Sequence, residues 1–323
     1  MKAKILRTDA ELFIIEQYLD ELSEIADVVT TESYAEDDLA EVAKDVDVIL
    51  TCYTNITSKV INAGPNLKGI VKYGVGTDAI DMEAATAKGV MVANCPDYGP
   101  DTVADHAFAL MISLARKIPT LDRAMRKNAW VWPEPKLLGL DLNGKTVGLI
   151  GFGRIGRAMS RCCEGFSMNR LVYDPYVEPA SVSEYGVSIV ALDELLTRAD
   201  FVSIHCVLTP ETKGLIDAAA LQTMKETAFL IDVSRGAIID EDALIQAIDE
   251  KRIAGAGFDV FGHEPLTPDY PLLGRDNVIL TPHLAWWTEE AFERVERDTL
   301  DGILDILAGK IPKHLKNTEV LEP

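Results

Sequence analysis

Short apolar segments alternate with helical patterns twice along this chain of 323 residues. The first series of segments is typical of strands and comprises residues 4–6, 28–29, 46–50, 70–73 and 90–93. The second series comprises residues 146–150, 171–173, 188–190, 201–206, 229–233, 257–260 and 278–280. Stretches between them, such as 9–22 and 35–43, have the polar patterning of helices. Strands that alternate with helices predict parallel sheets covered on both faces, so we expect an α/β protein with two doubly wound domains.

The boundary between the two series is expected near residues 96–100, where proline and glycine cluster. A strongly apolar helical pattern at 102–116 follows it. Another helical pattern begins at Thr288, after the second series of strands is complete, and could return to the first domain. The segment 130–135 contains two tryptophans and two prolines and is interpreted as an ordered loop that could serve as an inter-subunit arm.

The charge of the chain excludes some classes of partner. Its 52 acidic and 31 basic residues give a formal charge of −21, which repels phosphate backbones and anionic membranes. Nucleic-acid binding is therefore not expected as a main role. No apolar run approaches the ~20 residues of a membrane span, and early charges argue against a signal peptide. Five cysteines without a C-x-x-C pair fit a reduced, cytoplasmic protein.

A glycine-rich turn follows the first strand of the second series. Gly151, Gly153 and Gly156 form a G-x-G-x-x-G pattern between the strand 146–150 and a predicted helix at 157–163. Gly151 permits a tight turn, Gly153 lets the backbone approach a pyrophosphate, and Gly156 lets the helix pack closely on the strand. The amides at the helix N-terminus then face the phosphates. The pattern alone is weak, but its position between strand and helix predicts a dinucleotide site.

An acidic residue in the expected place supports this interpretation. The next strand, 171–173, ends at Asp174, whose carboxylate can accept both ribose hydroxyls of an adenosine and would repel a 2′-phosphate. Arg154 adds a positive side chain near the turn. A glycine turn without a ligand is the alternative, and the joint occurrence of strand, helix and acid disfavours it. The predicted cofactor is therefore NAD rather than NADP.

Three later strands end in polar residues suited to acid–base chemistry. Arg235 follows the strand 229–233, Asp259 and Glu264 lie at the end of the next strand and in its exit loop, and His283 follows the last strand. Ligands of open α/β sheets bind beyond the carboxyl ends of strands. A histidine can exchange a proton near neutral pH, a carboxylate can orient it, and an arginine can bind a substrate carboxylate. Taken alone, Arg235 is better interpreted as a structural arginine paired with Asp232 or Asp259. Its combination with Glu264 and His283 favours the functional interpretation.

Several ordered motifs resemble the D-isomer-specific 2-hydroxyacid dehydrogenase family over nearly the whole chain. They are 71–81, 101–107, the glycine turn through Asp174, 234–236, 259–265 and 281–285. The resemblance implies a Rossmann cofactor domain, residues 101–285, inserted into a flavodoxin-like substrate domain, residues 1–100 and 286–323. It also implies an NAD-dependent oxidoreductase that acts on C2 of a small anionic 2-hydroxy or 2-keto acid, commonly as a homodimer.

The resemblance also implies roles for individual residues. Arg235 binds the substrate carboxylate and carbonyl, and His283 is the acid/base with Glu264 as its partner. Substrate contacts are expected from the backbone of the substrate domain and from aromatic side chains, namely Tyr53, Val75, Gly76 and Trp286. Further cofactor contacts, besides the glycines and Asp174, are expected at Thr102, Arg154, Ile155, Cys206, Thr209, Val233 and Asp259.

This sequence departs from the family pattern at a few positions. Asp232 stands where the family usually has asparagine, and its charge could weaken the grip of Arg235 on an anion. Lys72 stands where phosphoglycerate dehydrogenases have a phosphate-binding arginine, but residues 51–53 supply no second cation. A phosphorylated substrate is therefore disfavoured, and phosphoglycerate dehydrogenase remains an alternative.

A second alternative comes from Trp286 and Trp287, which resemble a segment of the C-terminal-binding proteins, dehydrogenase-like corepressors. An NADH-sensing interaction protein of that kind ranks below the enzyme because no partner domain or long regulatory tail is evident. His106 lies on an apolar helix and is interpreted as a packing or interface residue. No two histidines have metal-ligand spacing, so no metal is expected.

Overall fold

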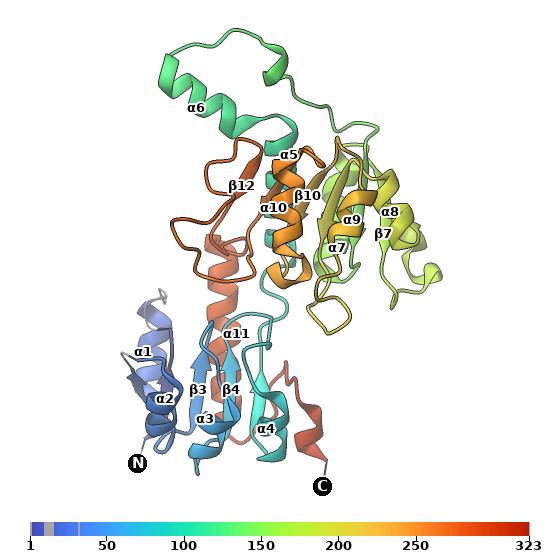
Figure 1. Ribbon diagram of the computed structural model, residues 1–323. Helices are drawn as coiled ribbons and strands as arrows, with labels where there is room; N and C mark the ends of the chain where they lie inside the picture. Colours follow the sequence, from blue (N-terminus) through green and yellow to red (C-terminus); the bar gives the residue numbers. More distant parts are fainter. Residues whose placement is uncertain (1, 10–15, 32, 323) are drawn as a thin grey trace. The chain divides into compact units, whose positions relative to one another are not determined.

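A computed structural model describes residues 2–9, 16–31 and 33–322 of the chain. The chain forms two compact units, which are described separately (Figure 1). The first comprises Met1–Gly99 and Thr288–Pro323, and the second comprises Pro100–Trp287. The second unit is thus inserted into the first along the sequence.

The first unit contains a parallel sheet of five strands in the order β2-β1-β3-β4-β5. The strands are β1 (Ala3–Arg7), β2 (Ala26–Thr30), β3 (Val48–Thr51), β4 (Gly69–Lys72) and β5 (Met91–Ala93). This is the flavodoxin-like order, as predicted. The helices are α1 (Glu16–Ile25), α2 (Glu36–Ala43), α3 (Ser58–Ala63), α4 (Met82–Ala87) and α11 (Glu289–Leu307). Helix α11 packs closely on β4, where a Cβ on Gly69 would lie 2.5 Å from the side chain of Ile306.

The second unit contains a parallel sheet of seven strands in the order β12-β11-β10-β9-β6-β7-β8. The strands are β6 (Thr146–Ile150), β7 (Asn169–Tyr173), β8 (Ser188–Ile189), β9 (Phe201–Ile204), β10 (Phe229–Asp232), β11 (Gly255–Phe258) and β12 (Val278–Leu280). The order reverses beside β6, which is the crevice where Rossmann folds bind dinucleotides. Helices surround the sheet: α5 (Pro100–Ala115), α6 (Ile118–Asn128), α7 (Arg154–Gly165), α8 (Leu192–Arg198), α9 (Ala218–Thr223) and α10 (Glu241–Asp249). The predicted two-sheet α/β fold is confirmed.

The strands of the second sheet are buried on both faces, which explains their nearly continuous apolar sequences. All four residues of β9 and of β10 are buried. Their side chains divide between two apolar clusters, with Val202 and Ile204 in one and Phe201 in the other. Burial of each large aliphatic or aromatic side chain stabilises the fold by roughly 1.5–3 kcal/mol. This rigid sheet fixes the positions of the loops at its carboxyl edge.

Two features of the fold differ from the sequence-based expectations or lie beyond them. Helix α6 was not predicted, and none of its residues is buried within the chain. Part of the helix predicted at 9–22 lies outside the described residues, and α1 begins at Glu16. Thr288 caps α11 through its side chain, as the pattern there indicated. No helix in the described part of the chain is long and apolar enough to cross a membrane.

Candidate active site

The glycine turn, residues 151–156, has the shape that its sequence predicted. Gly151 has a φ of +93°, and a Cβ there would lie 2.5 Å from the backbone nitrogen of Cys206. A Cβ on Gly156 would lie 2.2 Å from the carbonyl oxygen of Gly151, so only glycine allows α7 to start against the turn. A Cβ on Gly153, by contrast, would meet nothing within 4 Å. The turn is therefore tight against the protein on two sides and open at Gly153, which fits a pyrophosphate at the N-terminus of α7.

Asp174 lies at the carboxyl end of β7 and braces this turn. Its Oδ2 accepts a hydrogen bond from the backbone N–H of Phe152 at 2.8 Å, and its Oδ1 accepts from the N–H of Tyr176 at 2.9 Å. The carboxylate is thereby fixed beside the turn, where the sequence placed it.

The other residues predicted to contact a cofactor are distributed over neighbouring loops of the same unit. Arg154 and Ile155 occupy the first turn of α7, and Thr102 lies in the first turn of α5. Val233 follows β10, while Cys206 and Thr209 follow β9, where the hydroxyl of Thr209 lies 3.3 Å from that of Thr212. Nearby His205 is buried, and burial lowers its pKa to about 3, so the ring stays neutral beside the turn.

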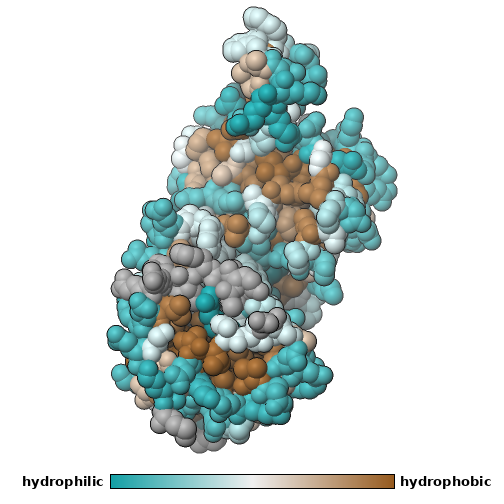
Figure 2. Space-filling view, turned by 90° about the vertical axis from the view of Figure 1, so that its left-hand side faces the viewer, coloured by the Kyte–Doolittle hydropathy of each residue, from teal (hydrophilic) through white to brown (hydrophobic). Residues whose placement is uncertain are grey.

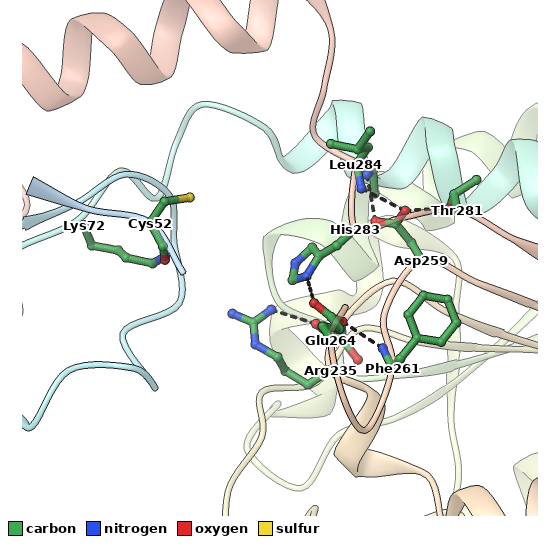
Figure 3. A network of polar contacts seen from close by, with 11 residues as sticks. Cys52, Lys72, Arg235, Asp259, Phe261, Glu264, Thr281, His283 and Leu284 are labelled. Carbon is green, nitrogen blue, oxygen red and sulfur yellow. Dashed lines mark hydrogen bonds and ion pairs between the residues drawn. The ribbon is translucent and has the colours of Figure 1, made fainter. Parts of the chain in front are cut away.

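Arg235, Glu264 and His283 gather at the carboxyl edge of the adjacent strands β10, β11 and β12, and together they form what we call the histidine cluster (Figure 3). The Nδ1 of His283 lies 2.6 Å from the Oε2 of Glu264. The Oε1 of Glu264 accepts the backbone N–H of Phe261 at 2.8 Å. The Nδ1 face of the His283 ring is thus directed at the carboxylate of Glu264.

The electrostatics of the cluster keep Glu264 charged. Partial burial by itself would raise its pKa. The hydrogen bond and charge of His283, the Phe261 N–H and the positive charge of Arg235 outweigh burial and hold the pKa below its ordinary value. Glu264 is therefore an ionised partner for the imidazole, as an acid/base pair requires.

Gly236 explains how Arg235 comes close to Glu264. A Cβ on Gly236 would lie 2.0 Å from the carbonyl carbon of Phe261. Only glycine lets the loop after β11 pass directly over the loop after β10. The glycine of the Ser-Arg-Gly motif thus has a packing role that brings two functional loops together.

The loop that contains His283 is held by Asp259, whose side chain is 1% exposed. Its Oδ1 accepts from the hydroxyl of Thr281 at 2.5 Å and from the N–H of Leu284 at 3.0 Å. Its Oδ2 accepts from the N–H of Ala285 at 2.7 Å. His106 of α5 reaches the same loop, since its Nε2 lies 2.9 Å from the hydroxyl of Thr281. The interpretation of His106 as a packing residue missed this polar contact.

The comparisons with known proteins agree with this geometry. Residues 108–285 match the model of the NAD-binding domain of the D-isomer specific 2-hydroxyacid dehydrogenases. The chain belongs to this family of oxidoreductases. It is 40% identical over 287 residues to a glyoxylate reductase of Korarchaeum cryptofilum, a match that covers 88% of this chain and 86% of the relative.

Two further relatives show the range of the family. A D-3-phosphoglycerate dehydrogenase of Archaeoglobus fulgidus is 38% identical over 295 residues. The match covers 91% of this chain but only 56% of that relative, so the chain spans little more than half its length. An NADPH-dependent glyoxylate/hydroxypyruvate reductase of Sinorhizobium meliloti, solved with NADP and malonate, superposes with a TM-score of 0.88 at 28% identity, over 99% of this chain and 98% of that one. The family thus includes users of NADP as well as NAD.

In this dehydrogenase, Asp232 is a buried acid just before the histidine cluster. Its Oδ1 accepts both the N–H and the hydroxyl of Ser234, at 2.7 and 2.5 Å. Its Oδ2 has no hydrogen-bond partner among the described residues. Burial raises its pKa to about 7, although Ser234 and Arg235 act in the opposite direction. Near neutral pH, therefore, Asp232 is only partly charged, and its expected interference with Arg235 is reduced.

The residues predicted to contact substrate in the first unit lie around the ends of β3 and β4. Tyr53 and Val75 are 43% and 45% exposed. The loop that contains Val75 and Gly76 is fixed by Asn94, whose Nδ2 donates to the carbonyl of Val75 at 2.6 Å. Lys72 is buried, donates to the carbonyl of Cys52 and lies 5.7 Å from the centre of the Tyr53 ring.

Trp286, the last residue predicted to contact substrate, is 7% exposed and belongs to the second unit. Its ring packs edge-on against Trp287, with centroids 4.9 Å apart. Trp287 is 41% exposed, so the second tryptophan of the pair presents more surface to solvent. Within the part of the chain that is described, no group of three or more His, Cys, Asp or Glu side chains could hold a metal ion.

Proposed function

We propose that this dehydrogenase interconverts a small 2-keto acid and the corresponding 2-hydroxy acid with NADH as the preferred hydride donor. The observation that supports this most is the 2.6 Å contact between His283 and Glu264 beside Arg235. A histidine–carboxylate pair next to a guanidinium combines a proton source with an anion-binding group.

Each side chain has a distinct task in the proposed reaction. A bound nicotinamide supplies or accepts the hydride at C2. His283 gives a proton from Nε2 to the carbonyl oxygen during reduction and takes it back during oxidation. Glu264 holds the ring by Nδ1 and stabilises its protonated form. Arg235 binds the substrate carboxylate.

The substrate class we propose is unphosphorylated. Glyoxylate, hydroxypyruvate and longer 2-keto acids fit the similarity to a glyoxylate reductase. Lys72 is the cation nearest the predicted substrate loop in sequence, and its ammonium group is bound to the carbonyl of Cys52. The neighbouring residues Thr51, Cys52 and Tyr53 add no second positive charge that would balance a phosphate dianion.

A panel of 2-keto acids with NADH tests the proposal. Loss of NADH absorbance with glyoxylate, hydroxypyruvate or a longer acid is expected, and phosphohydroxypyruvate should react more slowly. Folded, NADH-binding protein that oxidises no cofactor with any acid of the panel would contradict the proposed activity. Faster turnover of the phosphorylated acid would instead favour a phosphoglycerate dehydrogenase.

The preference for NADH over NADPH rests on the carboxylate of Asp174. Fluorescence titration should give clearly tighter binding of NADH. The variant Asp174→Ala removes the charge that would repel a 2′-phosphate, so it should narrow the gap between the two cofactors by about tenfold or more, equivalent to ~1.4 kcal/mol. An unchanged ratio of the Kd values for NADH and NADPH would mean that a group other than Asp174 distinguishes the two riboses.

We also propose that the dehydrogenase forms a homodimer through its second unit. Trp130 and Trp132 are 63% and 75% exposed, and α6 buries none of its residues. A pocket of about 370 Å³ lies at the start of α6, lined by apolar side chains such as Leu114 and Phe229 and by polar ones such as Lys117. Figure 2 shows apolar surface on the face that it draws. Light scattering should report a dimer, and Trp130→Ser with Trp132→Ser should shift it toward monomer.

A further inference from the structure

The backbone of His283 has a conformation that contacts from other residues must stabilise. Its φ is +57°, in the left-handed region that residues with a side chain rarely adopt. From this backbone conformation at the exit of β12, the imidazole reaches Glu264 in the loop after β11 (Figure 3). Released from its surroundings, the loop would favour ordinary φ values, and the ring would turn away from its partner.

Asp259 makes contacts on both sides of this strained residue. It accepts the hydroxyl of Thr281 before His283 and the N–H groups of Leu284 and Ala285 after it. A carboxylate that is 99% buried accepts these three hydrogen bonds with both of its oxygens. Charge-assisted bonds of this kind are strong in a buried setting. His106 braces the same loop through Thr281.

We infer that Asp259 is a positioning residue that holds His283 in its left-handed backbone conformation, with Thr281 and His106 as its supports. The inference rests on the proposed role of His283 as acid/base. Both carboxylate oxygens of Asp259 are directed into the loop 281–285, so this role is additional to the cofactor contact that the family resemblance implies. Asp259 thus affects the proton transfer through the geometry of the histidine.

A double-mutant cycle separates positioning from cofactor contact. Asp259→Asn keeps one acceptor oxygen but turns an NH₂ group toward a backbone donor. We expect kcat to fall on the order of 10–100-fold, as misplacement of a reacting group does. In an His283→Ala background, Asp259→Asn should lower the residual turnover less than about twofold further, because its effect passes through the missing ring. Equal losses in both backgrounds would overturn the inference.

If Asp259→Asn does not fold, two matched variants of Thr281 test the same inference. Thr281→Val removes the hydroxyl with little change of shape, and Thr281→Ser keeps it. The valine variant should lose several-fold in kcat, with the serine variant near wild type, and the NADH Kd should be constant in both. Equal kcat values for the two variants would overturn the inference.

A measurement without turnover separates this inference from the proposed function. In ¹⁵N NMR of labelled histidines, the hydrogen-bonded Nδ1 signal of His283 should be present in the wild type and in Thr281→Ser. It should be weakened or shifted in Thr281→Val. If the wild type reduced no 2-keto acid while these shifts appeared, the proposed function would fail and the positioning would stand. An unshifted signal in Thr281→Val would overturn the positioning whatever the activity.

Discussion

The glycine turn and the histidine cluster lie in the same unit, yet they are built in different ways. The turn is a continuous segment between β6 and α7, and its glycines lie against backbone atoms of the turn itself and of residues 205 and 206 after β9. The histidine cluster takes its three side chains from the loops after three strands, and a buried carboxylate holds one of these loops. The difference teaches that the residues of the turn can be recognised in one short segment of sequence, whereas the geometry of the histidine cluster depends on the order of three strands in the sheet.

The largest expected effect is that of removing the imidazole. His283→Ala should lower kcat by about 10²–10⁴-fold, since it removes the proton donor of the reaction. The Kd for NADH should change little, because the glycine turn is untouched. Steady-state kinetics together with NADH fluorescence check both numbers. Turnover equal to that of the wild type would show that His283 is not the acid/base, and the histidine cluster could then no longer be contrasted with the glycine turn as a catalytic site.

Glu264→Gln should come next in size. The amide keeps the shape of the side chain but loses the charge that stabilises the imidazolium, so kcat should fall on the order of 10²-fold or more. The pH dependence gives a second test. The pKa of Glu264 is held below its ordinary value of 4.5, so its carboxylate stays charged as the pH falls toward that value. Wild-type activity should therefore not be lost by protonation of Glu264 at pH 5–6, which a pH profile of kcat would show.

Within the glycine turn, the expected effect is on binding rather than turnover. A methyl group on Gly153 meets no protein atom within 4 Å but fills the open side of the turn. Gly153→Ala should therefore raise the NADH Kd by about tenfold or more, and the thermal midpoint should shift by no more than about 3 °C. Gly165→Ala is a matched control at the other end of α7, where a Cβ also meets nothing. Unchanged NADH affinity in Gly153→Ala would mean that phosphates do not approach the turn there.

The same contrast explains what the sequence could predict. The strands and the glycine turn follow from local patterns of two to six residues, and their positions were predicted nearly as found. Helix α6 was not predicted, and it buries no residue within the chain. The polar residues at the strand ends were identified, and the order β12-β11-β10 brings them to one edge.

Contacts between distant segments were beyond the sequence. The bonds from Leu284 and Ala285 to Asp259 span 25 and 26 residues, and the contact of His106 with Thr281 spans 175. Such pairs depend on strand register and on the packing of α5 against the sheet. No local pattern signals the left-handed backbone of His283, although a histidine placed directly between Pro282 and Leu284 at a strand exit marks the segment as a turn.

The smallest expected effect concerns the free energy of unfolding, which depends on the buried acid Asp232 near the histidine cluster. Because burial raises the pKa of Asp232 to about 7, the folded protein keeps its proton at pH values where the unfolded chain, with an ordinary pKa of 3.8, has lost it. Unfolding then releases a proton, so the free energy of unfolding falls as the pH rises from about 4 to 7 and levels off above it.

Asp232→Asn removes this titration. Relative to wild type, the free energy of unfolding of the variant should therefore increase with pH, by about 1.4 kcal/mol between pH 6 and pH 8. Urea unfolding at several pH values measures this difference, and Asp20→Asn on the exposed side of α1 is a control that should leave it constant. If the free energies of unfolding of Asp232→Asn and wild type changed with pH in parallel, the charge of Asp232 would be stabilised by a partner in the folded protein. In that case Arg235 would be its partner, and the guanidinium would be less available to a substrate carboxylate than the histidine cluster requires.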